Sequence, residues 1–179
     1  MTPAEDMLDR AAAAALALAV DRPWRQVSLR DIAARAGLAF ADLYEHAQSK
    51  GAVMAHLSSR FDRAALATAN GPDADVHDRL FEAVMARIEA MEPHRAALVA
   101  IARADPLNVA KRLPHTARAI LEAAGVDATP PRLAAMTAVW TRTLQVWRDD
   151  EGALNRTMAE IDRRLKQMRA QLKRIGAGF

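Results

Sequence analysis

The sequence contains no cysteine, which excludes disulfide bonds as a source of stability. Its eight aromatic residues are too few for the large core of a β-sandwich, and its seven glycines and eight prolines are too few for a disordered or fibrous chain. The 179 residues are enough to bury a core, and common residues such as Ala, Leu, Arg and Glu are helix formers. The composition therefore predicts an all-α, soluble protein.

Catalytic motifs are also missing from the sequence. It has no His-Glu-x-x-His, no Gly-x-Ser-x-Gly and no glycine-rich phosphate loop. The five histidines are scattered singly along the chain, at positions 46, 56, 77, 94 and 115. We therefore expect no enzymatic activity, no metal site and no cofactor.

Signals for export or membrane insertion are absent as well. The apolar run at residues 11–20 follows the acidic residues Glu5, Asp6 and Asp9, whereas a signal peptide carries a basic segment there. No stretch approaches the roughly 18 uncharged apolar residues of a membrane span. We expect the protein to have no transmembrane segment and to reside in the cytoplasm.

The positive charge is confined to one end of the chain. The isoelectric point is near 9.8, although the net charge is only +3. Residues 1–60 carry seven cationic and seven acidic side chains, residues 61–162 carry twelve and fifteen, and residues 163–179 carry six and none. The isoelectric point is therefore no evidence that the first third of the chain binds nucleic acid.

Apolar residues recur at helical spacing along most of the chain. The clearest break is at Asn70–Asp73, and an apolar stripe from Leu80 to Met91 ends at Pro93. Besides this stripe and two short helices between Ser28 and Tyr44, the pattern predicts helices over residues 3–20, 50–69, 94–104, 106–124 and 131–150.

A final helix has the most regular pattern. Its apolar residues alternate by four and three: Leu154, Met158, Ile161, Leu165, Met168, Leu172 and Ile175. Basic residues project away from this seam: Arg163, Lys166, Lys173 and Arg174. The seam favours packing within the domain or against a second subunit. Peripheral contact with anionic lipid is the second interpretation.

One segment has the pattern of a helix-turn-helix motif. Ser28 and Asp31 form a capping box, which predicts the start of a helix. Gly37 permits a turn, and Ile32 and Leu38 are placed to hold the two short helices together. The stretches Asp-Ile-Ala-Ala-Arg-Ala-Gly and Tyr-x-His-x-x-Ser-Lys follow each other here. In these residues the chain resembles the TetR family of transcriptional regulators.

The resemblance covers about residues 8–57 and implies a two-part, all-α fold. Residues 1–52 would form a helix-turn-helix module, and residues 53–179 a helical ligand-binding and dimerisation domain. A homodimer would bind operator DNA as a repressor and be released by a small apolar ligand. The residues implied to contact phosphates are Ser28, Tyr44, His46 and Lys50, and those implied to face bases are Phe40 and Ala41.

Three residues depart from the family pattern. Ala39 stands where a hydroxyl residue usually caps the recognition helix, and Ala47 stands where a bulky aromatic is usual. Asp42 places a negative charge on a helix that has to approach a polyanion. Together with the zero net charge of residues 1–60, these features predict weak DNA binding.

A second resemblance lies later in the chain. Residues 78–85, 93–95, 146–150 and 157–165 look like the lipid-binding accessory proteins of coenzyme Q biosynthesis, which share the TetR fold and are not regarded as binding DNA. This resemblance implies an alternative function, the binding of a lipid or isoprenoid. Candidate pocket residues for the small apolar ligand of a regulator are Met85, Met136, Trp140 and Trp147, which are otherwise ordinary core or dimer contacts.

Overall fold

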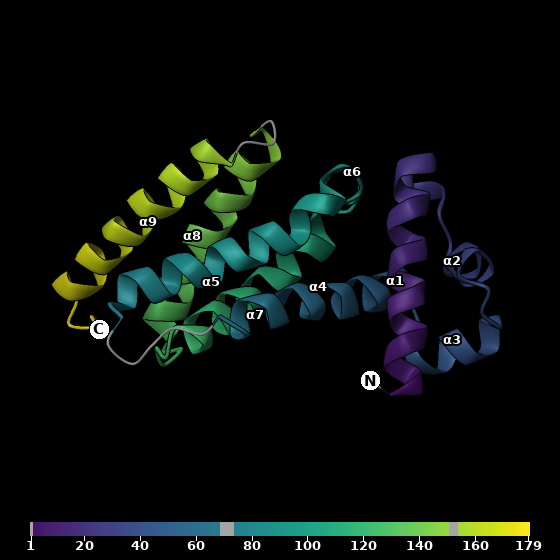
Figure 1. The fold of residues 1–179 in the computed structure, drawn as a ribbon, viewed down its shortest axis with the longest axis horizontal. Helices are drawn as coiled ribbons and strands as arrows, with labels where there is room; N and C mark the ends of the chain where they lie inside the picture. The colour runs from purple at the N-terminus through teal and green to yellow at the C-terminus, as the bar shows by residue number, and fades with distance from the viewer. Residues whose placement is uncertain (1, 69–73, 151–153) are drawn as a thin grey trace. The chain divides into compact units, whose positions relative to one another are not determined.

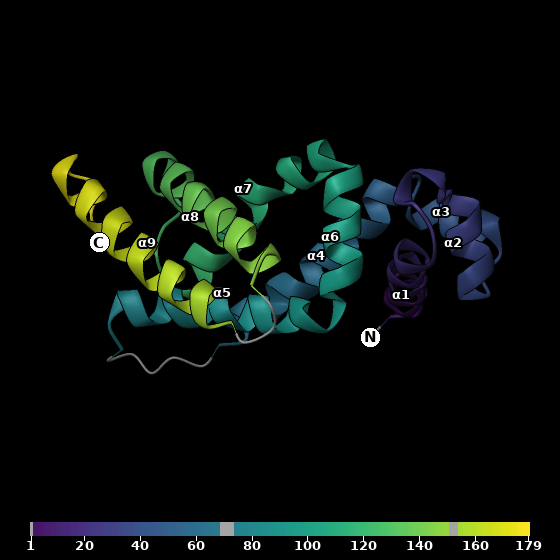
Figure 2. The ribbon, with the colours of Figure 1, turned by 90° about the horizontal axis from the view of Figure 1, so that it is seen from above.

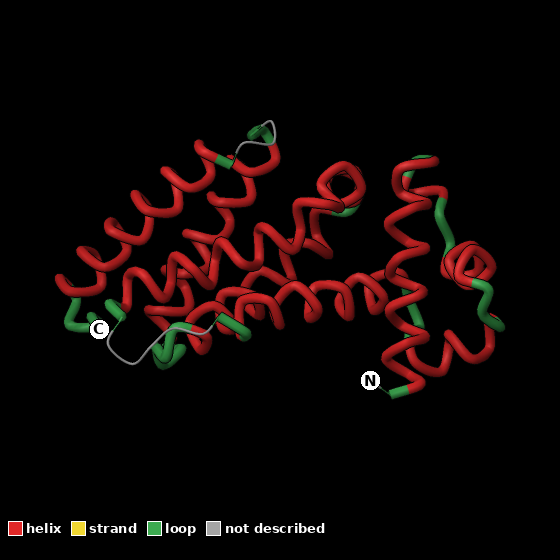
Figure 3. Tube along the Cα trace, in the orientation of Figure 1, coloured by secondary structure: helices red, strands yellow, loops and turns green. Residues whose placement is uncertain are grey.

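The computed structural model describes residues 2–68, 74–150 and 154–179 (Figure 1). This part of the chain consists of helices and loops and contains no strand, which confirms the all-α prediction (Figure 3). The helices are α1 (Pro3–Asp21), η1 (Trp24–Gln26), α2 (Leu29–Ala36), α3 (Phe40–His46), α4 (Lys50–Leu66), α5 (Val76–Met91), η2 (Glu92–His94), α6 (Arg95–Ala104), α7 (Pro106–Ala123), α8 (Pro130–Arg148) and α9 (Asn155–Arg174). The predicted break at Asn70–Asp73 lies outside the described residues.

The chain divides into two compact units. Unit 1 comprises residues 1–60 and 94–111, and unit 2 comprises residues 61–93 and 112–179. These limits differ from the predicted division at residue 52, because α6 packs against α1 and belongs to unit 1. The buried side chains of α6 are Ala97 and Ile101. The predicted division at residue 52 separates a DNA-binding module from a ligand-binding and dimerisation domain, and this functional division stays a prediction.

In unit 1, α2 and α3 pack against α1 and against each other. The buried side of α1 is mostly alanine, which leaves room for neighbouring helices to approach closely. Ile32 of α2 and Leu43 of α3 are completely buried. Burying such a side chain contributes about 1.5–3 kcal/mol to folding, so these two residues fix the short helices in place. A hydrogen bond also links α4 to α1, since Nε2 of His56 lies 2.7 Å from Oδ1 of Asp9.

In unit 2, α9 lies beside α8 and α5 (Figure 2). The centre of its predicted seam is buried, at Ile161, Leu165, Met168 and Leu172, whereas Met158 and Ile175 are exposed. The four basic residues predicted opposite the seam are exposed. A lipid contact by α9 would therefore depend on its basic face. None of the described helices is long and apolar enough to cross a membrane.

A buried cation lies in the core of unit 2. The guanidinium of Arg87 donates through Nε to Asp62 at 2.7 Å and through Nη2 to Thr116 at 3.2 Å, and its Cζ lies 4.7 Å from the ring centroid of Trp140. Burial lowers the pKa of Arg87, against the attraction of Asp62. Removing either partner would leave an uncompensated buried charge, so the pair constrains how α4, α5 and α8 pack.

Candidate nucleic-acid interface

Ser28 fixes the start of α2. Its hydroxyl accepts a hydrogen bond from the Asp31 amide at 3.1 Å and donates to the Asp31 carboxylate at 2.7 Å, and its own amide donates to the same carboxylate at 2.8 Å. These bonds from Ser28, with a further one from Arg22, lower the pKa of Asp31 to about 2. The predicted capping box is confirmed. A phosphate contact by Ser28 would have to share or replace its bond to Asp31.

The turn between α2 and α3 depends on Gly37. This residue has φ of +64°, the left-handed conformation that suits glycine. The Arg10 guanidinium of α1 donates to the carbonyl oxygens of Ala36 at 2.8 Å and Gly37 at 3.2 Å. Arg10 thus satisfies the last carbonyl of α2 from α1, while the amides of Gly37 and Leu38 bond the carbonyls of Ala34 and Ala33, and the turn is held in place.

The start of α3 has no side-chain cap. Ala39 occupies the N-cap position with an extended backbone, and no side chain accepts a bond from the first amides of the helix. Ala47 at the other end is 2% exposed, so a small side chain fills the place where the family pattern has a large one. With seven residues, α3 relies on Leu43 to anchor it to the module.

The outer face of α3 carries four of the predicted DNA contacts. Ala41, Tyr44 and His46 are exposed, and Phe40 is half-buried. The rings of Tyr44 and Phe40 lie near each other, with centroids 5.8 Å apart, and Tyr44 is 47% exposed. Their exposure leaves Ala41, Tyr44 and His46 accessible to a partner, as a contact with DNA requires.

The sixth predicted contact, Lys50, has its ammonium group directed into unit 1. Its Nζ donates to the carbonyl oxygen of Trp24 at 2.8 Å and lies 4.6 Å from the centroid of the indole ring. Burial lowers the pKa of Lys50, against the attraction of Asp105 and Asp31. Because an ammonium has three donors, the bond to Trp24 leaves two for a phosphate.

The charges around α3 are only partly favourable to DNA. Asp42 and Glu45 are both exposed on this helix. Several nearby cations are paired within the module, as the ion pairs from Arg22 to Asp31 and from Arg35 to Asp21 illustrate. Arg30 of α2 has no ion-pair partner among the described residues, and its guanidinium Cζ lies 4.3 Å from the ring centroid of Phe40. Arg30 was missed from the sequence because only α3 was considered for contacts with bases, and Arg30 lies on α2. Glu45 was missed because only Asp42 was considered as a source of repulsion from DNA.

The predicted ligand-pocket residues all lie in unit 2 and are all buried. Met85 is on α5, and Met136, Trp140 and Trp147 are on α8. The indole nitrogen of Trp147 donates to the carboxylate of Glu92 at 2.7 Å. The four residues thus belong to the core. Both tryptophans contact charged groups there, Trp147 the Glu92 carboxylate and Trp140 the Arg87 guanidinium.

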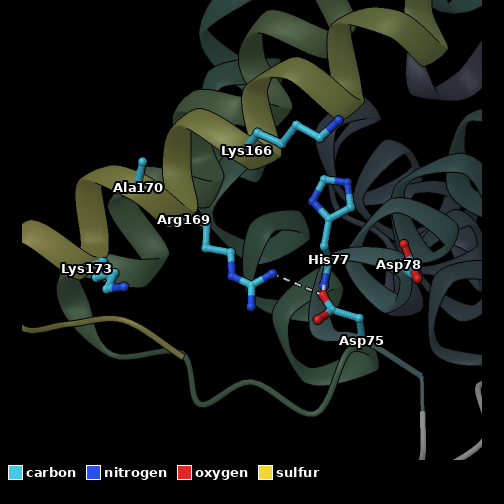
Figure 4. A pocket seen from close by; sticks show the side chains of 7 residues that line it. All are labelled: Asp75, His77, Asp78, Lys166, Arg169, Ala170 and Lys173. Atoms are coloured by element: carbon cyan, nitrogen blue, oxygen red, sulfur yellow. Dashed lines mark hydrogen bonds and ion pairs between the residues drawn. The ribbon is translucent and has the colours of Figure 1, made fainter.

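An open surface pocket of about 480 Å³ lies between α9 and the start of α5 (Figure 4). Its lining residues are Asp75, His77, Asp78, Lys166, Arg169, Ala170 and Lys173. Arg169 pairs with Asp75 at 3.1 Å, and Lys166 and His77 contact Asp162 at 2.8 and 3.0 Å. The Arg169–Asp75 and His77–Asp162 pairs join α9 to the start of α5, whereas the Lys166–Asp162 pair lies within α9. The described residues contain no cluster of three or more His, Asp or Glu arranged to hold a metal ion.

Comparisons with known proteins agree with this geometry. Residues 12–57 match the family model described as bacterial regulatory proteins, tetR family. A TetR transcriptional regulator from Nitrosomonas europaea ATCC 19718 superposes with a TM-score of 0.71 at 21% identity, over 90% of this chain and 97% of that one. A TetR transcriptional regulator from Rhodococcus sp. RHA1 gives 0.68 at 19% identity, over 92% and 95%. No curated protein sequence matches the chain.

The family model covers α2, α3 and the turn between them, and the structural similarity extends over about nine-tenths of the chain. The resemblance predicted from the two sequence stretches is therefore confirmed: this chain has the TetR-type helical fold, with an N-terminal segment that matches the tetR family of bacterial regulatory proteins.

Proposed function

We propose that this protein is a cytoplasmic transcriptional repressor that binds operator DNA as a homodimer and releases it when unit 2 takes up a small apolar ligand. The observation that carries the proposal is the helix-turn-helix itself. A capped α2, a turn at Gly37 and an exposed outer face of α3 occur in the segment that matches the family model, and Arg10, just before that segment, holds the turn.

DNA binding would divide the contacts into two kinds. Ser28, Tyr44, His46 and Lys50 would contact phosphates, which set position and affinity, and Phe40 and Ala41 would face bases, which set sequence. In a homodimer the two α3 helices would enter successive major grooves, about 34 Å apart along the DNA. The acidic side chains on α3 make the expected affinity low, and the phosphate contacts make it dependent on salt.

Ligand control would act through the core of unit 2. An apolar molecule among Met85, Met136, Trp140 and Trp147 would separate helices that now contact each other, and so favour a second arrangement of the domain. The ligand acts as an inducer only if it binds that arrangement more tightly than the DNA-binding one. Native mass spectrometry would test this part by giving the subunit count and the mass of any bound molecule.

The direct test of the DNA-binding proposal is a gel shift at low salt. The purified protein should shift the DNA upstream of its own gene saturably, and an unrelated fragment of equal length should compete poorly. Failure to shift promoter fragments even at low salt would refute the proposal.

The second candidate function is lipid or isoprenoid binding without DNA binding. The observations that favour it are the exposed Asp42 and Glu45 on α3 and the uncapped start of that helix at Ala39, which all weaken a recognition helix. Co-purified lipid seen by mass spectrometry, together with no gel shift, would establish this candidate over the first.

A further inference from the structure

We propose that the ligand of unit 2 is an uncharged molecule with a carbonyl oxygen, and that the hydroxyl of Thr143 on α8 binds this oxygen. The inference rests on the proposed ligand control and adds to it the chemical class of the ligand and its polar contact. The four candidate pocket residues predicted from the sequence supply apolar surface, and Thr143 supplies a hydrogen-bond donor beside them.

Thr143 carries a hydroxyl that is buried without a hydrogen-bond partner. The residue is 0% exposed, and its Oγ1 has no partner among the residues that the structure describes. Two other threonines of α8 are paired in the usual way, since Oγ1 of Thr137 donates to the carbonyl oxygen of Leu133, and Oγ1 of Thr141 to that of Thr137, both at 2.7 Å. Because buried hydroxyl groups are nearly always paired, the unpaired one on Thr143 points to a partner from outside the chain.

The position of Thr143 on α8 places it among the candidate pocket residues. Trp140 comes three residues earlier and Trp147 four residues later, spacings that put the three side chains on one side of the helix. Met136, seven residues before Thr143, extends the same side, and all four residues are buried. The hydroxyl therefore lies in an apolar strip of α8, with an aromatic side chain before it and another after it.

The charged groups next to this strip favour an uncharged ligand. The guanidinium of Arg87 lies against the ring of Trp140, and its Nε donates to the Asp62 carboxylate at 2.7 Å. At the other end of the strip, the Glu92 carboxylate accepts the indole N–H of Trp147 at 2.7 Å. A ligand carboxylate would add a third negative charge to the two present, and a ligand ammonium would be buried together with the Arg87 guanidinium. Either charge would be costly to bury here.

A carbonyl group meets the requirements of Thr143 best. The hydroxyl proton needs an acceptor, and a carbonyl oxygen accepts it without introducing a charge. A ligand hydroxyl or amide would introduce a donor of its own, which would in turn need an acceptor within the apolar strip. The indole rings of Trp140 and Trp147 offer apolar surface to the body of the molecule. The ligand class is therefore a ketone or another uncharged carbonyl compound with an apolar body.

The test compares 1-tetralone, a bicyclic ketone, with tetralin, the same ring system without the carbonyl, and with tetralin-1-carboxylate. Isothermal titration calorimetry would measure the binding of each to the full-length wild type, to Thr143→Val, which keeps the shape but removes the hydroxyl, and to Thr143→Ser. The control is Thr137→Val, which removes a paired hydroxyl from the same helix.

The wild type should bind 1-tetralone roughly 2- to 12-fold more tightly than tetralin, and the carboxylate most weakly. Thr143→Ser and Thr137→Val should keep the preference for the ketone, and Thr143→Val should bind the ketone and the hydrocarbon equally. The proposal is wrong if the wild type shows no preference or binds none of the three compounds. It is also wrong if Thr143→Val keeps the preference, or if the carboxylate binds most tightly.

Thermal denaturation without ligand gives an independent readout. Thr143→Val should raise the melting temperature by about 2 °C or more, because it removes an unpaired buried polar group. Thr137→Val gives up a hydrogen bond and should bring no such gain. A lower melting temperature for Thr143→Val would show that the hydroxyl already has a partner within the protein, and the proposal would be wrong.

These measurements use no DNA, so they separate the inference from the proposed function. If 1-tetralone binds through Thr143 but does not release operator DNA in a gel shift, the ligand site stands and the proposed control of DNA binding fails. If tetralin and 1-tetralone release DNA equally well from the wild type and from Thr143→Val, the proposed function stands and the inference about Thr143 is wrong.

Discussion

Adding a cap to α3 should stabilise the protein measurably. The N-cap residue Ala39 is exposed and has φ of −64° and ψ of 133°, the extended backbone conformation that capping residues adopt. No side chain accepts a bond from the first amides of α3. In Ala39→Ser the new hydroxyl would take the place that the Ser28 hydroxyl occupies at the start of α2, where it accepts an amide bond at 3.1 Å.

The expected gain in the free energy of unfolding is about 1 kcal/mol, within a range of roughly 0.5–2 kcal/mol for such caps. The lower half of the range applies here, because Asp42 at the third position of α3 is one methylene shorter than the glutamate that completes a capping box most often. For a chain of this length, 1 kcal/mol raises the melting temperature by about 2–4 °C.

Thermal and urea denaturation followed by circular dichroism would measure this gain. The matched control is Ser28→Ala, which deletes the existing cap of α2 and should lower the free energy of unfolding by a similar amount. If Ala39→Ser is no more stable than the wild type while Ser28→Ala loses stability, then the first amides of α3 already have a partner and the reasoning is refuted.

Two other substitutions test the electrostatic arguments. Asp42→Lys should tighten DNA binding on all sequences several-fold at low salt, and it should steepen the dependence of log K on log salt by about 0.9 for each new phosphate contact. The control is Asp127→Lys, on an exposed loop of unit 2. An equal effect of the two substitutions would show that residue 42 does not approach DNA. Burial alone would raise the pKa of Glu160, but hydrogen bonds from two arginines of α9 outweigh burial and hold it at about 2, below its ordinary value of 4.5. The ionised Glu160 should therefore stabilise the protein fully above pH 4.5, and this stabilisation should disappear as the pH falls toward 2. Glu160→Gln should lower the free energy of unfolding by about 1–2 kcal/mol at pH 7, a value reduced because solvent screens the half-exposed arginines. The loss should be smaller at pH 3. Urea denaturation at the two pH values checks this result, and the exposed Asp149→Asn should show little change at either.

Helix positions were predictable from the sequence because they depend on local patterns. The capping box at Ser28, the glycine turn and the apolar stripe of each helix are all contained within a few consecutive residues. The uncapped start at Ala39 could be predicted for the same reason, and the structure has no side-chain cap there. These features determine most of the fold.

Side-chain partners distant in sequence could not be predicted. Lys50 donates to Trp24, 26 residues earlier, and Arg10 holds the end of α2 from α1. Arg30 lies over Phe40 because α2 and α3 meet at an angle that no periodicity specifies. The limits of unit 1 could not be predicted either, since the packing of α6 against α1 joins segments far apart in the chain.

The salt dependence of DNA binding tests the central claim most directly. Anisotropy of a labelled fragment from upstream of the gene, titrated with protein between 50 and 300 mM salt, should show saturable binding. The logarithm of the binding constant should fall linearly with the logarithm of salt, with a shallow slope of about −2 to −4, because only Lys50 and His46 of each protomer are potential cations among the predicted phosphate contacts. No saturable binding at 50 mM salt would contradict the account.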